Sequence, residues 1–236
     1  MKKIFLAACL FVTTLSANAQ REVGTFSIIP RLGVDIANLS NEAIYYSGNA
    51  ASIVDENKGK YKAGLRAGVD FDYQLLPQVS VSAGVFYSQR GCRYSDNEIL
   101  ISDKDNRYSG INDWNTDLQY LDVPIVANVY LAKNLAFKAG VQFGFSLGDG
   151  NVEYTETEFV KKEDGSKEYA ESQKHKFDVA TNKLDIAIPV GFSYEYDNVI
   201  LDARYNFGLC DTFKKPLSQG QKNKSFTVTV GYRFAL

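Results

Sequence analysis

The amino-acid sequence predicts an all-β fold, namely an eight-stranded antiparallel up-and-down transmembrane β-barrel with long extracellular loops and short periplasmic turns. Three observations support this prediction. Eight stretches alternate apolar and polar residues with the two-residue period of a strand. The connections between these stretches are alternately long and minimal. Tyr and Phe number 15 each against a single Trp, a bias that favours strands and membrane-interface belts.

The first 19 residues are predicted to be a secretory signal peptide. A basic start precedes the apolar run 4–12, and Ala17-Asn18-Ala19 supplies the small residues of a cleavage site. Cleavage leaves residues 20–236 as the barrel domain. The stretch that ends at Cys9 also resembles a lipoprotein box, an alternative that shortens the apolar run and is therefore not preferred.

Charge and hydropathy exclude two classes of protein. The chain has 26 basic and 28 acidic residues, so it lacks the basic surface of a nucleic-acid-binding protein. After residue 19 no stretch approaches the roughly 18 consecutive apolar residues of a membrane-spanning helix. The membrane prediction therefore depends on alternation.

The first half of the chain contains four predicted strands. Residues 25–37 and 62–75 alternate large apolar residues with Arg, Asp or Gly. Residues 79–92 alternate Val, Ala or Tyr with Ser, Gly or Arg, and Phe86 is an apolar exception in the polar row. Residues 117–131 set Leu, Val and Ile against Asp, Pro and Asn.

The second half contains the other four strands. Residues 135–147 alternate most regularly, and Val141 at their centre is expected to face lipid near the middle of the bilayer. Residues 184–196 and 199–210 follow, the latter with Leu, Ala, Tyr and Phe opposite Asp, Arg, Asn and Gly. Residues 225–236 alternate without interruption to the last residue.

The predicted loops alternate in length. The long ones cover residues 38–61, 93–116, 148–183 and 211–224, and the turns lie at 76–78, 133–134 and 197–198. Residues 93–116 are predicted to be a polar loop. Within the third loop, residues 152–160 and 167–177 flank Asp164-Gly165, a strong hairpin signal, and predict a β-ribbon above the membrane. Its apolar residues, expected to be available for contact, are Val152, Tyr154, Phe159, Tyr169 and Phe177.

Glycines distinguish the barrel from a soluble β-sandwich, in which the polar row would face water. Solvent-facing strand positions favour Thr and Lys, and Gly there weakens a strand. Inside a barrel of eight strands space is scarce, so Gly fits between charged neighbours. The glycines on the polar row are Gly33, Gly64, Gly68, Gly84, Gly140, Gly144, Gly191, Gly208 and Gly231.

The inward row predicts a network of charges in the lumen. The basic members are Arg31, Arg66, Arg90, Lys138, Arg204 and Arg233, and the acidic members are Asp35, Asp70, Asp72, Asp122, Asp185, Glu195 and Asp202. Burying an unpaired charge costs several kcal/mol, so near-equal numbers indicate mutual pairing. We predict a filled, ion-paired interior rather than a continuous water pore. The sequence does not assign the individual pairs; Asp70 and Asp202 are examples of a paired carboxylate that could be removed together with Arg66.

Few residues suggest catalysis, and we predict no catalytic, cofactor or metal site. His175 with Ser172 could form the base and nucleophile of a lipid-modifying enzyme, but a solvated loop histidine is the preferred interpretation. Residues 103–108 begin like a calcium loop and then place Arg at a ligand position and Tyr where Gly is required. Cys92 and Cys210 are predicted to remain free, because their strands lie opposite each other in the ring.

The sequence shows two separate resemblances to outer-membrane barrels, one to an insertion signal and one to a family. Thr229, Gly231, Phe234 and Leu236 follow the pattern of the C-terminal signal by which barrel-insertion machinery recognises outer-membrane β-barrels. Residues 120–125, with the stretches 64–73 and 86–91, resemble the PorT-like outer-membrane barrels of Gram-negative bacteria. The resemblance implies an eight-stranded barrel with an aromatic-rich outer face, and it implies no particular activity.

The functional prediction is a non-enzymatic outer-membrane anchor that presents surface loops for protein or glycan contact. The alternatives are an accessory factor in secretion or envelope assembly, a narrow porin-like channel and, last, a lipid-modifying enzyme. The expected partners are outer-membrane lipid, the barrel-insertion machinery and a secretion or envelope protein. We expect a monomer that binds no nucleic acid and no cofactor.

Overall fold

The structure is a computed structural model that describes residues 22–40, 59–215 and 220–236. The predicted signal peptide and most of the predicted loop 38–61 lie outside the described residues. In the described part of the chain, no helix is long and apolar enough to cross a membrane.

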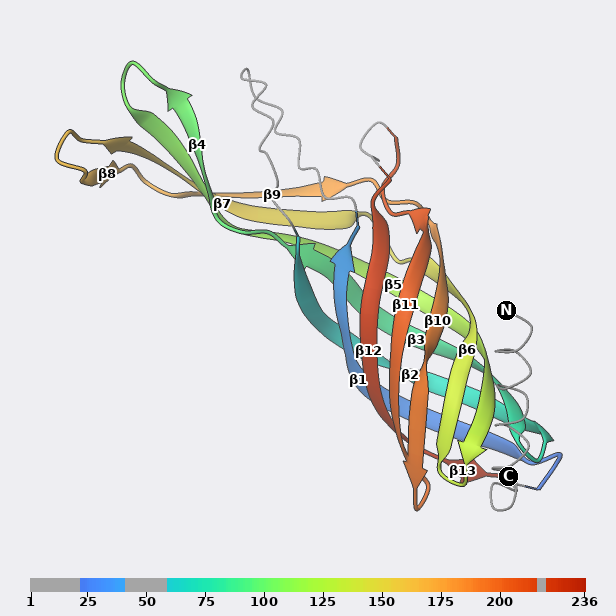
Figure 1. The fold of residues 1–236 in the computed structure, drawn as a ribbon. Helices are drawn as coiled ribbons and strands as arrows, with labels where there is room; N and C mark the ends of the chain where they lie inside the picture. Colours follow the sequence, from blue (N-terminus) through green and yellow to red (C-terminus); the bar gives the residue numbers. More distant parts are fainter. Residues whose placement is uncertain (1–21, 41–58, 216–219) are drawn as a thin grey trace, which may run out of the picture.

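Eight strands close a ring through the pairing of β3 with β5. Figure 1 shows the barrel that this ring forms. In all, the described residues form thirteen strands, namely β1 (Phe26–Leu39), β2 (Lys60–Leu76), β3 (Val79–Arg93), β4 (Asn97–Ser102), β5 (Arg107–Ala132), β6 (Leu135–Ser146), β7 (Gly150–Lys161), β8 (Lys167–Tyr169), β9 (Gln173–Val179), β10 (Leu184–Tyr196), β11 (Val199–Asp211), β12 (Lys222–Tyr232) and β13 (Phe234–Ala235). The ring order is β3, β2, β1, β12, β11, β10, β6, β5, and β5 pairs back to β3. Barrel strands that follow one another in the chain are neighbours, so the predicted up-and-down barrel is confirmed.

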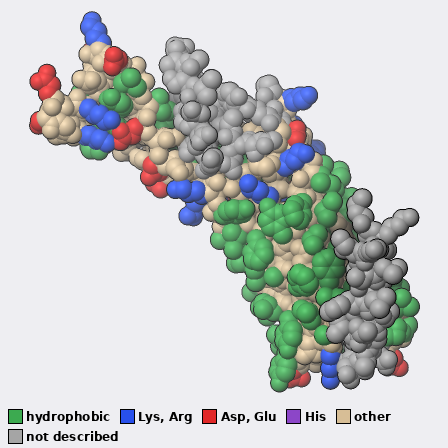
Figure 2. Space-filling view, in the orientation of Figure 1, with side chains coloured by type: hydrophobic (Ala, Val, Ile, Leu, Met, Phe, Trp, Pro, Cys, Tyr) green, Lys and Arg blue, Asp and Glu red, His purple; other side chains and the backbone are tan. Residues whose placement is uncertain are grey.

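The register of the ring confirms the predicted alternation. β1 and β12 join the two ends of the chain, with Arg31 opposite Gly231 and Val34 opposite Val228. Along β1, Arg31 and Asp35 are buried whereas Leu32 and Val34 are exposed on the outer surface. Apolar side chains cover the outside of the barrel in Figure 2, and charged side chains gather at its ends and on the part beyond it.

The closing strand differs from its prediction at both ends. β12 begins at Lys222, inside the stretch predicted to be a loop, and the strand is interrupted before β13. The interruption is at Arg233, whose backbone N–H donates to the carbonyl of Asn198 at 2.8 Å. The uninterrupted alternation of residues 225–236 therefore does not correspond to an uninterrupted ladder.

The prediction of a polar loop over residues 93–116 is wrong. β4 and the first part of β5 form a hairpin there, and β5 runs continuously for 26 residues rather than starting at residue 117. Asn, Asp and Ser suggested turns, but pairing with distant strands overrides such weak preferences. Ile111, for example, lies opposite Asn97 on one side and Glu156 on the other.

The strands outside the ring form a second part of the molecule, which we call the arm. The arm comprises β4, β7, β8, β9 and residues 107–117 of β5. Its sheet order is β4, β5, β7 and then β8 and β9, and Figure 1 shows it leaning away from the long-loop end of the barrel. The predicted β-ribbon is confirmed, but it is longer than predicted and also pairs with β5.

The arm has a packed interior of its own. Val152 and Phe159 are only 5% and 3% exposed, so the expectation that both are available for contact is wrong. The Phe159 ring stacks on Tyr108 at 5.5 Å between centroids. The arm is therefore an ordered extension of the barrel wall.

Ion pairs fasten the tip of the arm. The Glu98 carboxylate on β4 lies 2.5 Å from Lys167 Nζ and 3.1 Å from Lys161 Nζ. Hydrogen bonds from Lys167 and then Lys161 hold the pKa of Glu98 below its usual value. These contacts join β4 to β7 and the β8 turn across the sheet.

Candidate functional site

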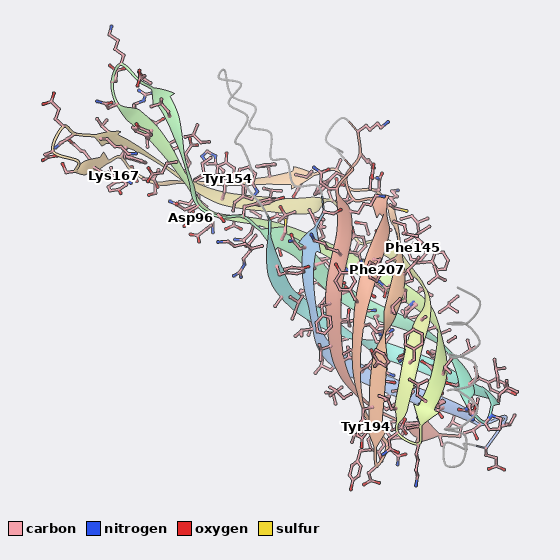
Figure 3. The ribbon with its side chains drawn as sticks, in the orientation of Figure 1. Asp96, Phe145, Tyr154, Lys167, Tyr194 and Phe207 are labelled. Atoms are coloured by element: carbon pink, nitrogen blue, oxygen red, sulfur yellow. The ribbon has the colours of Figure 1, made fainter. Side chains whose placement is uncertain are left out.

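Aromatic side chains mark both rims of the apolar belt. In Figure 3, Phe145 and Phe207 point outward near the long-loop end of the barrel, and Tyr194 points outward at the short-turn end. Two girdles of aromatic residues around an apolar band are typical of barrels that span a bilayer. The arm lies beyond the Phe145 rim.

The lumen contains three groups of ion pairs, the first around Asp202. The Asp202 carboxylate lies 2.5 Å from Lys138 Nζ, 2.6 Å from Arg204 Nε and 3.6 Å from Arg31 Nη1. Arg31 Nε also lies 2.7 Å from Asp70. The fully buried Asp202 carboxylate therefore shares its negative charge among three cations.

The second group is centred on Asp122. Its carboxylate contacts Arg90 and lies 2.7 Å from Arg66 Nη1. Arg66 also pairs with Asp35 at 3.1 Å, and Arg90 with Asp185 at 2.9 Å. The carboxylates that pair with Arg66 are therefore Asp35 and Asp122, an assignment that the sequence left open.

The third group lies at the short-turn end of the lumen. Arg233 Nη1 is 2.8 Å from Asp72, and Arg233 Nε is 3.2 Å from Glu195. With this group, the structure places each of the thirteen predicted lumen charges beside an opposite charge.

Two further features of the inner face follow from crowding. A Cβ on Gly144 would lie 3.0 Å from Asp122 Oδ1 and 3.4 Å from Asp185 Cβ, so glycine leaves room for the carboxylates. Phe86, the apolar exception, is fully buried, and the Arg66 guanidinium lies 4.8 Å from its ring centroid. Its ring therefore stabilises a buried cation.

Apolar side chains close the lumen at the end that carries the arm. Leu39, Cys92, Leu118, Tyr120 and Phe213 form a buried cluster there. The Tyr120 hydroxyl in this cluster accepts a hydrogen bond from Asn223 Nδ2 at 3.1 Å. The interior is thus ion-paired along its length, and an apolar cluster lies at its outer end.

The predicted insertion signal lies on the closing strands. Thr229 and Gly231 are buried on the inner face of β12, whereas Phe234 and Leu236 are exposed on the outside. Leu236 donates its backbone N–H to the Phe26 carbonyl at 2.9 Å, beside the short turns.

The residues considered for catalysis do not come together. His175 lies 3.2 Å from Glu156, and the Ser172 hydroxyl bonds to Thr157 instead. No group of three or more His, Cys, Asp or Glu side chains that could hold a metal ion occurs in the described ranges. No disulfide joins Cys92 to Cys210, as predicted.

A row of aromatic rings crosses the base of the arm. Trp114 on β5 stacks on Tyr154 on β7 at 4.9 Å, and Tyr154 stacks on His175 on β9 at 4.9 Å. Tyr94, just after β3, meets Trp114 edge-on at 5.8 Å. The row therefore joins the segment after β3 to β5, β7 and β9.

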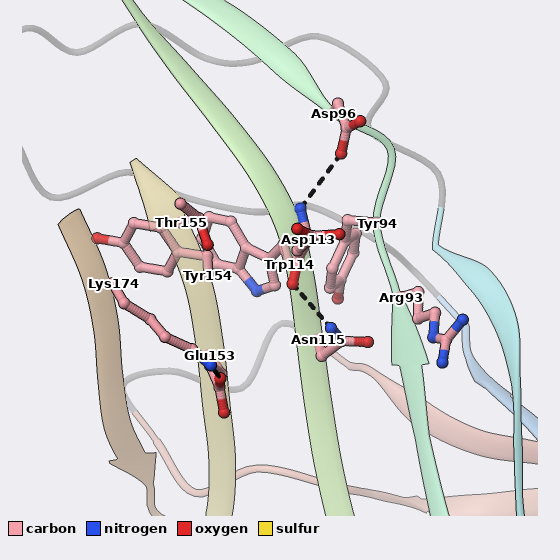
Figure 4. A pocket seen from close by; sticks show the side chains of 10 residues that line it. All are labelled: Arg93, Tyr94, Asp96, Asp113, Trp114, Asn115, Glu153, Tyr154, Thr155 and Lys174. Atoms are coloured by element: carbon pink, nitrogen blue, oxygen red, sulfur yellow. Dashed lines mark hydrogen bonds and ion pairs between the residues drawn. The ribbon is translucent and has the colours of Figure 1, made fainter. Parts of the chain in front are cut away.

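Next to this row lies a pocket of about 390 Å³, shown in Figure 4. Its lining residues are Arg93, Tyr94, Asp96, Asp113, Trp114, Asn115, Glu153, Tyr154, Thr155 and Lys174. The pocket forms where β5 carries one extra residue against β7, a β-bulge between Asn112 and Asn115. Asp113 at the bulge has a φ of 55°, a left-handed conformation that Asp tolerates better than most residues.

Hydrogen bonds fix the bulge. The Asp113 N–H donates to Asp96 Oδ1 at 3.2 Å, and Asn115 Nδ2 donates to the Asp113 carbonyl at 2.7 Å. Lys174 contacts Glu153 on the opposite wall, and this hydrogen bond lowers the pKa of Glu153. The pocket was not predicted from the sequence, because the lining residues between positions 93 and 115 lie in a stretch that was predicted to be a loop.

Comparison with known proteins identifies the family. The profile of the family described as "Outer membrane protein beta-barrel domain" matches residues 18–214. No curated protein sequence matches the chain. The more specific resemblance to PorT-like proteins stays a prediction.

Several solved structures are similar to this chain at low identity. Ail, the attachment invasion locus protein of Yersinia pestis, in complex with the heparin analogue sucrose octasulfate, is 14% identical with a TM-score of 0.40, over 90% of this chain and 100% of Ail. Neisserial surface protein A is 11% identical with a TM-score of 0.38, over 89% and 97%. OprG of Pseudomonas aeruginosa is 12% identical with a TM-score of 0.37, over 92% and 99%. These similarities are too distant to transfer a function. The family match and the closed, apolar-belted ring together show that the chain belongs to the outer membrane protein β-barrel domain family and lies in the outer membrane of a Gram-negative bacterium.

Proposed function

We propose that the protein is a non-enzymatic surface-binding protein, in which the barrel is the anchor and the arm makes the contact with a partner outside the cell. The observation that carries this proposal is the continuity of β5, which runs from the barrel wall into the arm without a break. A binding surface on such an extension is held in place before binding. Binding then costs less ordering entropy than it would on a flexible loop.

The composition of the arm supports a contact role. Its surface mixes Lys and Glu with exposed Tyr169 and Phe177, and its base carries the aromatic row beside the pocket. Aromatic residues supply large contact area with few rotatable bonds, which is why they are frequent at binding sites.

The filled lumen favours an anchor over a channel. Ion pairs occupy the interior of the ring, and the apolar cluster around Leu118 and Phe213 closes its outer end. An enzymatic role is not supported by His175, because this side chain contacts Glu156 while Ser172 bonds elsewhere.

We further propose that Thr229, Gly231, Phe234 and Leu236 are the signal that the barrel-insertion machinery reads, and that the folded protein is a monomer surrounded by lipid. The outward exposure of Phe234 and Leu236 supports this proposal, because an insertion factor would meet these two side chains on the strand surface.

The first expected result concerns conductance. The purified protein, reconstituted in planar bilayers, should give no steady single-channel current, because a passing ion would have to displace buried ion pairs and the apolar cluster. A porin reconstituted in the same bilayers is the positive control. Large, steady unit currents would show that the lumen is a pore.

The second expected result concerns the arm. Deleting residues 152–177 should leave insertion and heat-modifiable gel mobility intact, because Asn151 and Asp178 are register partners and need only a tight link. Cells that display the full chain should bind members of an array of immobilised glycans and proteins. Cells that display the deletion variant in equal amounts should lose that binding.

A matched variant replaces only the tip turn, residues 162–166, with Asn-Gly. This variant keeps the base of the arm and should retain binding if the pocket region makes the contact. Equal binding by the full chain and the 152–177 deletion would refute the surface-binding function. Loss of the folded barrel band in the deletion would mean that the arm is needed for the barrel itself.

A further inference from the structure

The pocket at the base of the arm offers more hydrogen-bonding capacity than its neighbours use. Asn115 Oδ1 is buried and accepts no hydrogen bond from the described residues. A buried acceptor without a donor is costly, so a site of this kind favours a ligand that donates to it. Figure 4 shows Asn115 on the wall between Trp114 and Arg93.

The other polar groups of the pocket set the chemistry of that ligand. Asp96 and Asp113 are exposed carboxylates that accept hydrogen bonds, and Arg93 is an exposed donor on the same rim. Donors and acceptors thus converge within one small volume. Hydroxyl groups suit such a mixture, because each hydroxyl both donates and accepts.

The aromatic row supplies the apolar side of the pocket. Tyr94, Trp114 and Tyr154 line it, and the stack of Trp114 on Tyr154 fixes these two rings. A sugar ring presents C–H groups between its hydroxyls, so it can contact rings on one side and polar groups on the other. The volume of about 390 Å³ lies within the range of small-molecule sites.

Other ligand classes fit the pocket less well. A fatty acyl chain would leave the polar lining unpaired. A phosphorylated polymer would meet the carboxylates of Asp96, Asp113 and Glu153. A cationic side chain of a protein would meet the Arg93 guanidinium on the rim, and Lys174 on the far wall.

We propose that this pocket binds one or two sugar units of a neutral glycan, with Asn115 Oδ1, Asp96 and Asp113 accepting hydrogen bonds from hydroxyls and Arg93 donating to them. This inference rests on the proposed surface-binding function and names its ligand class. The fixed bulge at Asp113 means that the acceptors are positioned before the sugar arrives.

Trp114 makes the inference directly testable, because it is the only tryptophan of the chain and it lines the pocket. The full chain in lipid nanodiscs is titrated with maltotriose, with chitotriose, with the neutral, hexose-built outer part of the core oligosaccharide released from lipopolysaccharide and with trilysine. We expect saturable changes in Trp114 emission with at least one of the three oligosaccharides and none with trilysine. A response to core oligosaccharide alone assigns the ligand to the membrane's own glycans, and a response to the others assigns it to glycans from outside.

Three variants complete the test. Asn115→Ala should weaken binding about 3- to 10-fold, the usual effect of one lost hydrogen bond. Arg93→Ala should weaken it similarly, and because Arg93 is exposed this change leaves the bulge intact. Glu158→Gln, an exposed arm position outside the pocket, should leave the affinity unchanged.

Two outcomes overturn the inference: saturation with trilysine alone, and no saturable response to any oligosaccharide. A saturable response whose affinity is unchanged in both Asn115→Ala and Arg93→Ala would place the sugar elsewhere and refute this site. Binding of the arm to arrayed proteins, without any change in Trp114 emission on addition of the oligosaccharides, would refute the glycan inference. The proposed surface-binding function would then still stand.

Discussion

Asp202→Asn is expected to lower the free energy of unfolding by about 3–5 kcal/mol, the range for removing one partner of a buried ion pair. Asp202 is fully buried among Lys138, Arg204 and Arg31. Without its charge, three cations face one another in a poorly solvated lumen. Of the three cations, Arg31 keeps a second ion-pair partner, Asp70. Urea unfolding in lipid bilayers, followed by heat-modifiable gel mobility, measures the loss.

A double variant separates charge from packing. Adding Lys138→Met to Asp202→Asn removes the cation nearest to the lost carboxylate, and it should recover part of the stability. Asp117→Asn is the matched control, because Asp117 is exposed and pairs with Lys62 at 2.5 Å outside the lumen. An exposed pair contributes about 0–1 kcal/mol. Similar losses for Asp202→Asn and Asp117→Asn would show that the lumen is well solvated.

Val141→Arg is expected to cost about 2–4 kcal/mol of stability in bilayers, the penalty for arginine on the lipid face at the bilayer midplane. Val141 lies in the middle of β6, opposite Ile125 of β5, which is exposed on the outer surface. The neighbouring Gln142 points inward, is fully buried and accepts a hydrogen bond from Arg66 at 3.0 Å. Urea unfolding in bilayers measures the penalty.

The same substitution on the arm is the control for Val141→Arg. Val160→Arg changes an exposed strand residue outside the barrel, where water solvates the new charge, and should change barrel stability by less than about 1 kcal/mol. Spin labels at positions 141 and 142 give an independent check. A lipid-soluble quencher should reach only position 141, and equal accessibility at both positions would refute the orientation of β6.

The barrel strands were predictable because one physical cause acts on each of them. Lipid on one side and a crowded polar interior on the other impose the same two-residue alternation wherever a strand crosses the membrane. β10 agrees with its prediction at both ends, residues 184–196, and β6 differs from 135–147 by one residue. Phe86 was recognisable as an exception for the same reason.

The arm was less predictable because it lies outside the membrane, where contact with lipid does not impose an apolar face on each strand. Residues 97–111 are mostly polar on both faces, so the turn-forming residues dominated the prediction. Their strand conformation depends on β7, whose residues lie tens of positions further along the chain. The short stretch around Asp164-Gly165 was predictable, since a hairpin depends on neighbouring residues alone.

The sequence by itself determined that the lumen charges balance, because buried charge must be neutralised whatever the arrangement. Only the tertiary structure decided which charges meet. Asp122, for example, neutralises Arg66 and Arg90 from a strand two places along the ring from β2. The same holds for the pocket, which the residue types of 93–96 and 113–115 did not reveal. It exists because a one-residue bulge brings the end of β3, the bend of β5 and the start of β7 together, and the register of three strands is a property of the closed sheet.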